Sequence, residues 1–171
     1  MKKGASRDIY YEILTNSLSG ENFNASNNFA LEAGEQITIL NKLSEEQGAL
    51  RQTLLFTGLE VVSHNLNRKA TDLKLFEFGK IYWKQATENE KYQEGERLGL
   101  FLTGLSQPES WMDKPRAVTY HDLAQTVQNL LQRSNAIKFK SEASAAPWLQ
   151  YGLDLWRGKE RAGTLGLVKD S

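Results

Sequence analysis

The chain has 171 residues and no cysteine, which excludes disulfides and thiolate metal sites, and its two histidines cannot form a histidine-based metal site without carboxylates. Hydrophobic residues are 40% and charged residues 25%, as in a globular domain, and this argues against extensive disorder. Lys+Arg and Asp+Glu both number 21, so bulk charge does not favour a polyanion such as DNA. No apolar run has the length of a membrane span or the form of a secretory signal, so we expect a cytoplasmic protein without a membrane partner.

The N-terminal part is predicted to hold two strands. Alternating β-branched and aromatic residues over 7–18 predict the first strand, and QITILN at 36–41 predicts the second. The stretch between them, 19–35, is rich in Asn, Ser and Gly, which is typical of turns and loops.

A short helix and a longer one are predicted next. Ser44, with a glutamine three residues later, has the spacing of a capping box, and Glu45 would lie in the first helical turn, where a carboxylate is favourable. Apolar residues at spacings of four, three and four then predict a helix over about 54–69. Arg68 and Lys69 would lie in its last turn and complement the helix dipole.

The segment LKLFEFGKIYWK at 73–84 predicts a long strand. Alternation places Glu77 and Trp83 on one face and Phe76 and Phe78 on the other. Both faces are apolar in the middle, so we expect a central strand that is covered on both sides. Glu77 would then be buried and would need hydrogen-bond donors.

The second half is predicted to alternate between strands and one helix. A polar connection over 85–96 leads to a partner strand at 97–105, and a loop at 106–117 follows. Thr119 and Asp122 are spaced as a capping pair for an amphipathic helix over about 120–133. Three further short strands are predicted, the last two joined as a hairpin through Arg157-Gly158-Lys159: IKFKSE, QYGLDLWRG and AGTLGLV. These hairpin-like connections favour an α+β fold, with a mainly antiparallel sheet flanked by helices.

Motifs that carry chemistry are sparse. The sequence has no GxxxxGK[ST], GxGxxG or GxSxG, so the common phosphate loops and the nucleophile elbow are absent. Glu45 and its glutamate neighbour could form a metal pair, but helix-start electrostatics explains them more simply. Arg68, Lys69 and Lys74 could contact RNA, and a solvated helix end explains them equally well.

A collinear series of residues over 41–82 resembles the core domain of the bacterial phenylalanyl-tRNA synthetase β subunit. The family pattern reads N-P-L-S-E-E, then L-R-x-(S/T)-L-L-x-G-L-L, then N-x-N-R, then L-F-E-I-G. The matching residues are Asn41, Leu43, Ser44, Glu45, Glu46, Leu50, Arg51, Thr53, Leu54, Leu55, Gly58, Leu59, Asn65, Asn67, Arg68, Leu75, Phe76, Glu77 and Gly79. Two features depart from the pattern: Lys42 replaces the usual proline, and 146–156 replaces a His-Pro-Gly-Arg segment.

The resemblance implies a class II aminoacyl-tRNA synthetase fold without catalysis. In catalytic members the strand equivalent to 73–84 ends in an arginine that grips the ATP α-phosphate, and the resemblance places Trp83 there. An indole has no positive charge for phosphate, and Lys84 points to the opposite face. We therefore predict no catalytic, cofactor-binding or metal-binding residue in this chain, and a structural role for the motif residues Ser44, Glu45, Arg51, Asn67, Arg68, Glu77, Gly79 and Trp83.

For Glu77 we predict specific hydrogen-bond donors and a specific structural role. It is expected to accept hydrogen bonds from backbone N–H groups or from Arg51, and so to hold the helix at 54–69 against the sheet.

The whole chain, 1–171, is interpreted as one core domain and as a fragment of a longer β subunit. By resemblance it would pack on the catalytic α subunit in an α2β2 phenylalanine–tRNA ligase, with tRNA bound through the complex and with ATP and Mg²⁺ used by the whole enzyme. Two alternatives stay open: an autonomous adenylate-forming enzyme, which needs an arginine near Trp83 where none matches, and a stand-alone RNA-binding paralogue.

Overall fold

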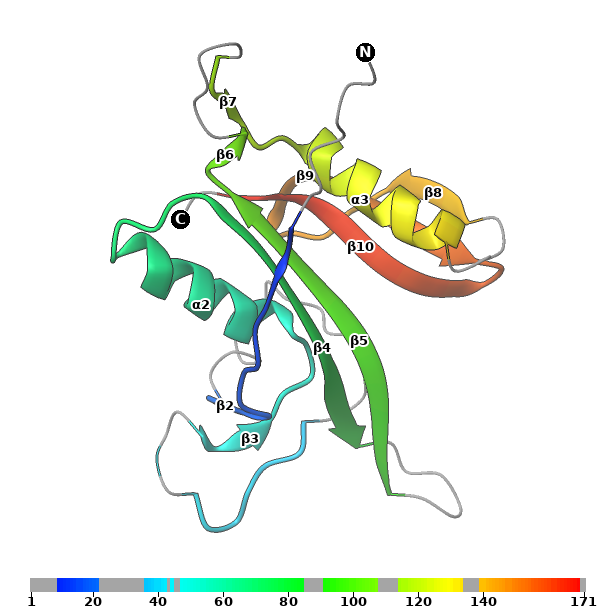
Figure 1. Ribbon diagram of the computed structural model, residues 1–171. Coiled ribbons are helices and arrows are strands. Elements are labelled where there is room, and N and C mark those ends of the chain that lie inside the picture. The colour runs from blue at the N-terminus through cyan, green and yellow to red at the C-terminus, as the bar shows by residue number, and fades with distance from the viewer. Residues whose placement is uncertain are drawn as a thin grey trace. The chain divides into compact units, whose positions relative to one another are not determined.

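The computed structural model describes residues 9–21, 36–42, 44, 47–84, 91–107, 114–133 and 139–169. Its described residues up to Leu105 belong to one compact unit, and those from Ser106 onward belong to a second. The first unit contains the helix α2 (Leu55–Leu66) and the second contains α3 (Tyr120–Arg133) (Figure 1). Within these ranges no helix is both long enough and apolar enough to cross a membrane. Within the described residues the β2–β3, β4–β5, β8–β9 and β9–β10 pairings are antiparallel and the β1–β4 pairing is parallel, which confirms the predicted α+β class.

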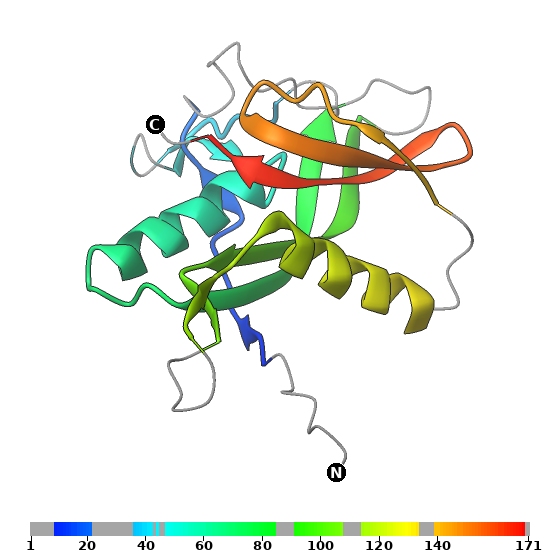
Figure 2. The same cartoon turned by 90° about the horizontal axis from the view of Figure 1, so that it is seen from above.

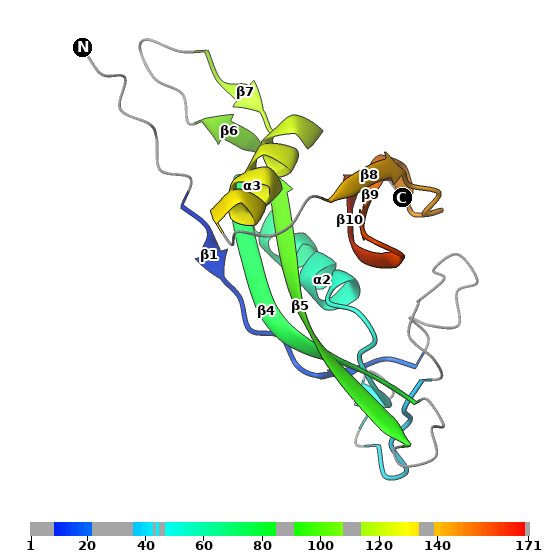
Figure 3. The ribbon, with the colours of Figure 1, turned by 90° about the vertical axis from the view of Figure 1, so that its right-hand side faces the viewer.

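The first unit is built on a three-stranded sheet in the order β1–β4–β5. Its long strands β4 (Leu73–Lys84) and β5 (Tyr92–Thr103) pair antiparallel along their full lengths, and the short β1 (Tyr11–Glu12) runs parallel to β4. The sequence analysis therefore placed β4 correctly, as a central strand. The partner strand begins earlier than the predicted 97, because its ladder with β4 continues to the end of the hairpin. In Figure 3, α2 lies along one face of the β4–β5 pair.

The strand predicted over 7–18 is only partly formed. It is reduced to β1 and to β2 (Leu18–Ser19), because the side chains between them take over the hydrogen bonding. Asn16 Oδ1 accepts a hydrogen bond from the N–H of Leu18 at 3.1 Å, and the Thr15 hydroxyl donates to the Glu77 carboxylate. These side-chain hydrogen bonds take the place of a regular backbone ladder with a neighbouring strand.

The strand predicted over 36–41 appears as one isolated bridge between Thr38 and Ala49, flanked by single backbone hydrogen bonds. Of the short helix expected after Ser44, Glu45 and Glu46 lie outside the described residues, and Gln47 has a 3₁₀-helical conformation. There the N–H of Gln47 donates to the carbonyl of Ser44 at 3.2 Å, and the chain enters β3 (Ala49–Leu50) two residues later. β3 pairs antiparallel with β2.

The helix predicted over 54–69 is α2, and it ends at Leu66, earlier than expected. Lys69 adopts a left-handed conformation with φ of 66°, which terminates the helix. Arg68 and Lys69 therefore follow the last turn instead of lying in it, which corrects the prediction.

Only one face of β4 is covered. Leu75, Glu77 and Ile81 are buried on the face that meets α2, whereas Phe78 on the other face is 57% exposed. The expectation that both faces are covered is therefore wrong within the described residues. On the covered face, α2 approaches so closely that a β-carbon at Gly58 would lie 2.0 Å from Cζ of Phe101.

The second unit contains a three-stranded antiparallel sheet in the order β8–β9–β10 and a small two-stranded one. The three predicted strands are β8 (Lys140–Ala143), β9 (Leu149–Arg157) and β10 (Glu160–Val168), and Figure 2 shows the last two as a curved hairpin. Gly158 forms the expected turn with φ of 65°. The predicted loop at 106–117 contains the paired strands β6 (Leu105–Gln107) and β7 (Arg116–Ala117).

The helix α3 begins and ends as predicted. The carboxylate of Asp122 accepts the N–H of Thr119 at 2.7 Å, which confirms the capping pair. Arg116 donates to the same carboxylate at 2.6 and 2.9 Å. These hydrogen bonds hold the pKa of Asp122 well below its usual range, with the Arg116 hydrogen bond as the largest cause.

Candidate functional site

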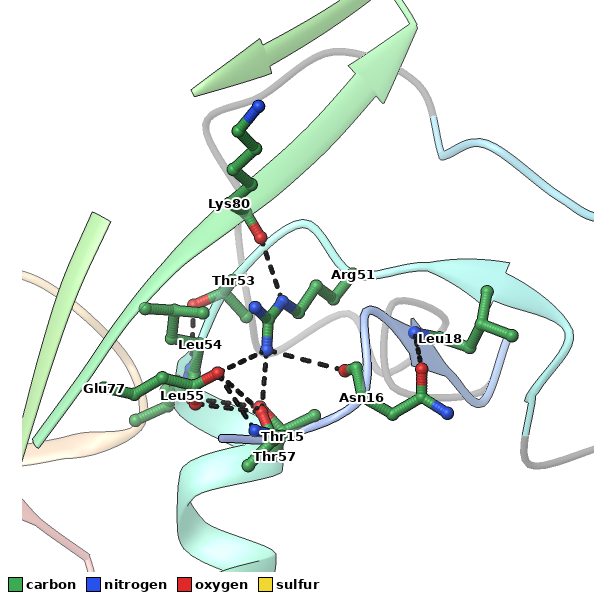
Figure 4. A network of polar contacts seen from close by, with 10 residues as sticks. All are labelled: Thr15, Asn16, Leu18, Arg51, Thr53, Leu54, Leu55, Thr57, Glu77 and Lys80. Atoms are coloured by element: carbon green, nitrogen blue, oxygen red, sulfur yellow. Dashed lines mark hydrogen bonds and ion pairs between the residues drawn. The ribbon is translucent and has the colours of Figure 1, made fainter. Parts of the chain in front are cut away.

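The first unit holds a buried ionic network centred on Glu77 (Figure 4). Glu77 is 1% exposed, and its carboxylate accepts hydrogen bonds from Arg51 and Thr15. Arg51 Nη1 lies 2.8 Å from Oε1, and the backbone N–H of Thr15 donates to the same oxygen at 3.3 Å. The Thr15 hydroxyl lies within 2.9 Å of both carboxylate oxygens. The expectation that Glu77 is buried and receives Arg51 and a backbone N–H is thereby confirmed.

Arg51 joins three parts of the chain through one guanidinium group. Its Nε donates to the carbonyl of Lys80 at 2.9 Å, and its Nη1 donates to the hydroxyl of Thr15 at 2.7 Å as well as to Glu77. The backbone carbonyl of Arg51 also accepts the N–H of Tyr82 at 2.9 Å. The segment before α2, the loop between β1 and β2, and the strand β4 are thus connected through this residue.

Gly79 leaves the space that the guanidinium occupies. A β-carbon at this position would lie 2.5 Å from Nη2 of Arg51 and 3.2 Å from Cδ2 of Leu54. Any side chain at Gly79 would therefore push Arg51 away from Glu77. This contact gives a physical reason for glycine two residues after the buried glutamate.

Among the described motif residues, Ser44, Asn67 and Arg68 do not take part in the buried network. Ser44 is exposed, and Glu45 lies outside the described residues. Asn67 is the C-terminal cap of α2 and Arg68 Nη1 donates to the carbonyl of His64 at 3.2 Å, both on the exposed helix end. The sequence series therefore combines one buried cluster with separate helix-end and loop positions.

Trp83 lies at the end of β4, on the same face as Glu77. Its ring packs over Gly95 of β5, since a β-carbon there would lie 3.2 Å from two atoms of the indole. The same β-carbon would lie 3.2 Å from Nη1 of Arg97, so a guanidinium lies on this face near Trp83. Arg97 is exposed and donates to the carbonyl of Glu96 at 2.9 Å.

Two residues of this region were missed by the sequence analysis. Arg97 could have been placed by the hairpin register, which puts it opposite Gly79 on the face of Trp83. Thr15 carried no usable signal, because its contact with Glu77 spans 62 positions of sequence through an irregular segment.

The donor set of this face does not fit a magnesium–nucleotide complex. Mg²⁺ prefers carboxylate oxygens, and Glu77 is the one carboxylate that β4 and β5 present on the side of α2. Both of its oxygens are engaged by Thr15 and Arg51. Throughout the described ranges, no group of three or more His, Cys, Asp or Glu side chains is arranged to hold a metal ion. The carboxylate of Glu77 is thus hydrogen-bonded by residues of the chain itself.

The fold is that of a class II aminoacyl-tRNA synthetase. The chain is similar to a solved pyrrolysyl-tRNA synthetase from Desulfitobacterium hafniense, with a TM-score of 0.59 and 17% identity, covering 91% of this chain and 49% of that one. A second structure of the enzyme from this organism gives a TM-score of 0.57 at 16% identity, covering 89% and 50%. At these identities the similarity shows the fold alone.

The particular family follows from the sequence. The model of the phenylalanyl-tRNA synthetase beta chain CLM domain matches residues 6–171, and the chain belongs to this family. It is 38% identical over 131 residues to the phenylalanine–tRNA ligase beta subunit of Bacteroides thetaiotaomicron, covering 72% of this chain and 16% of that protein. The beta subunit of Salinibacter ruber is 32% identical over 176 residues, covering 94% and 21%. The chain thus spans about a fifth or less of these relatives. This membership does not favour the stand-alone RNA-binding alternative.

Proposed function

We propose that this chain is a non-catalytic framework domain of a phenylalanine–tRNA ligase β subunit. It packs on the catalytic α subunit in an α2β2 assembly in the cytoplasm and supports ATP-dependent charging of tRNA with phenylalanine. ATP and Mg²⁺ act in the α subunit, and tRNA binds through the complex. The finer parts of this proposal, namely the α subunit, the tetramer, tRNA, ATP and the inactivity of the chain, rest on the resemblance and on the chemistry of the β4–β5 face.

The observation that supports the proposal most directly is that the indole ring of Trp83 packs over Gly95. The resemblance assigns this strand position to an arginine that grips the ATP phosphate, and an indole offers no such charge. Loss of one strong electrostatic contact to a transition state costs about 10²–10³ in rate, or about 3–4 kcal/mol. Arg97 does not occupy the position of that arginine, because it lies on the neighbouring strand β5, opposite Gly79 of β4.

The space next to α2 supports the same conclusion. Phe101 is buried and its ring tip reaches the helix backbone at Gly58, so side chains of the protein itself fill the gap between helix and sheet there. A substrate would have to displace this ring. Glu77 and Arg51 are likewise committed to each other, and neither supplies a group for proton transfer.

The proposal is tested by co-expressing the chain with the α subunit from the same organism, followed by size-exclusion chromatography and phenylalanine-dependent ATP–pyrophosphate exchange. We expect the chain to co-elute with α and to show no exchange when it is alone. In the full-length complex, Trp83→Phe should change the exchange rate by less than about twofold, since the chemistry occurs in α. Exchange by the isolated chain would overturn the proposal, and salt-sensitive tRNA binding without α would favour the RNA-binding alternative.

A further inference from the structure

The turn that joins α2 to β4, residues 67–72, carries two adjacent and exposed cations, Arg68 and Lys69. Figure 1 shows it where the chain leaves the end of α2 and reverses into β4. The sequence has no carboxylate from 61 to 71. The carboxylate that follows, Asp72, is engaged by the chain itself, because its Oδ1 accepts two hydrogen bonds at 2.8 and 3.4 Å. The turn is therefore locally positive, although the whole chain has no net charge.

Lys69 adopts a backbone conformation that glycine would adopt more easily. Its φ is 66°, in the left-handed region where a β-carbon crowds the backbone. Its N–H donates to the carbonyl of Leu66 at 2.9 Å, a hydrogen bond that glycine would also make. Within the part of the chain that the structure describes, the ammonium group of Lys69 has neither an ion pair nor a hydrogen bond. The lysine side chain thus strains the turn and gains no contact there that offsets the strain.

Helix-end electrostatics accounts for Arg68 better than for Lys69. Arg68 Nη1 donates to the carbonyl of His64 at 3.2 Å, which caps one of the last carbonyls of α2. A guanidinium group has five N–H donors, and this hydrogen bond uses one of them. Two neighbouring cations therefore offer further donors to a ligand at an exposed turn.

The exposed side chains around the turn are of the kinds that contact phosphate groups. Besides the two cations they are Ser63, His64, Asn67 and Thr71. Arg, Lys, Ser, Thr and Asn make most of the contacts to the phosphates of nucleic acids, whereas lysine and serine are depleted in protein interfaces. The one large apolar side chain among them, Leu66, is 40% exposed. This composition favours a phosphodiester backbone over a protein partner.

We propose that the α2–β4 turn binds the phosphodiester backbone of tRNA, with Arg68 and Lys69 each contacting a phosphate. The inference rests on the proposed function, in which tRNA binds through the complex, and it adds a contact on this chain. Phosphate contacts fix position and supply affinity but do not read the bases, so the turn orients the tRNA without selecting it. The strain at Lys69 is then explained, because a glycine would relieve it only by removing a cation.

The test uses the full-length enzyme with both subunits and an unmodified transcript of its phenylalanine tRNA. The Kd is measured by filter binding at several salt concentrations. Lys69→Gly removes one cation, and Arg68→Gln combined with Lys69→Gly removes both. The matched control, Arg157→Gln combined with Lys159→Gln, removes the same charge from the exposed β9–β10 turn.

We expect the salt slope of log Kd to fall by about one for Lys69→Gly and by about two for the double variant. The double variant should bind at least about tenfold more weakly at about 0.1 M salt, and the control should stay within about twofold of wild type. Lys69→Gly should also raise the temperature of unfolding, so its weaker binding cannot come from a damaged fold. Lys69→Arg keeps the charge and should bind as wild type does.

The other outcomes decide against the proposal. Unchanged affinity and slope in the double variant would overturn it, and an equal loss in the control would show that only total charge matters. Lys69→Arg that binds as weakly as Lys69→Gly would contradict a role for the charge, and loss of co-elution with α would make the turn an assembly contact. ATP–pyrophosphate exchange without tRNA is measured on the same samples. A wild-type complex that fails to assemble or to exchange marks failure of the proposed function, whereas normal exchange with unchanged tRNA affinity in the variant refutes the turn alone.

Discussion

Removing the negative charge of Glu77 tests how much the buried network contributes to the free energy of unfolding. Glu77→Gln keeps the shape of the side chain and one acceptor oxygen, but its amide group would face the donors of Thr15 and Arg51. Arg51 is 5% exposed, so the substitution leaves a guanidinium buried without a counter-charge. Breaking such a pair from one side costs about 3–5 kcal/mol. For a domain of this length, about 2–4 °C per kcal/mol gives a fall in Tm of roughly 6–20 °C.

The matched control is the exposed ion pair of the same strands. Lys80 and Glu94 lie 2.6 Å apart, but their side chains are 46% and 55% exposed. Glu94→Gln should therefore cost less than about 1 kcal/mol. Thermal unfolding of both variants, followed by circular dichroism, measures the difference. An unchanged Tm for Glu77→Gln, or an equal loss for both variants, would refute the reasoning that burial makes the network important.

Three further changes have expected outcomes that chemical denaturation can measure. Lys69→Gly should stabilise the chain by about 1 kcal/mol, because glycine adopts the left-handed conformation at φ 66° without the steric cost; a destabilised variant would contradict this. Gly58→Ala should destabilise by about 1–3 kcal/mol despite the better helix propensity of alanine, because its β-carbon would lie 2.0 Å from Phe101; a stabilised variant would show that the helix moves freely. Asp122→Asn should cost about 1 kcal/mol near pH 7 through the lost cap and the lost Arg116 contact. Because the pKa of Asp122 is lowered in the folded state, its charge stabilises the fold fully above the unfolded pKa of about 3.9, and this contribution is lost as the pH falls toward the lowered folded-state pKa; the difference between wild type and variant should therefore shrink in acid, and a difference that is the same in acid as at pH 7 would contradict this assignment.

The sequence predicted the elements whose signal is local and periodic. The twelve residues of β4, the helix α3 with its capping pair, and the β9–β10 hairpin are all found where alternation, helical spacing and turn residues placed them. The buried state of Glu77 also followed from its position in an apolar strand, and Arg51 was a correct candidate for its donor.

The failures have three separate causes. The strand at 7–18 is interrupted because Thr15 bonds to Glu77, and no local pattern reports that contact. The helix α2 ends at Leu66 because Lys69 adopts a left-handed conformation, which a lysine at this position does not predict. Phe78 is exposed although its strand is apolar on both faces. The alternation of residues shows which side chains lie on each face of a strand, but it does not show whether another element packs on that face.

The central proposal is that this chain has a class II synthetase fold but presents the indole of Trp83 where, by resemblance, catalytic members have an arginine that grips ATP. The most direct measurement is a crystal structure of the chain soaked with ATP and Mg²⁺ at millimolar concentration. We expect no ordered nucleotide on the α2 side of β4–β5, with Trp83 still packed on Gly95. An ordered nucleotide beside Trp83, its phosphates held by Arg97 or another basic side chain, would contradict the account.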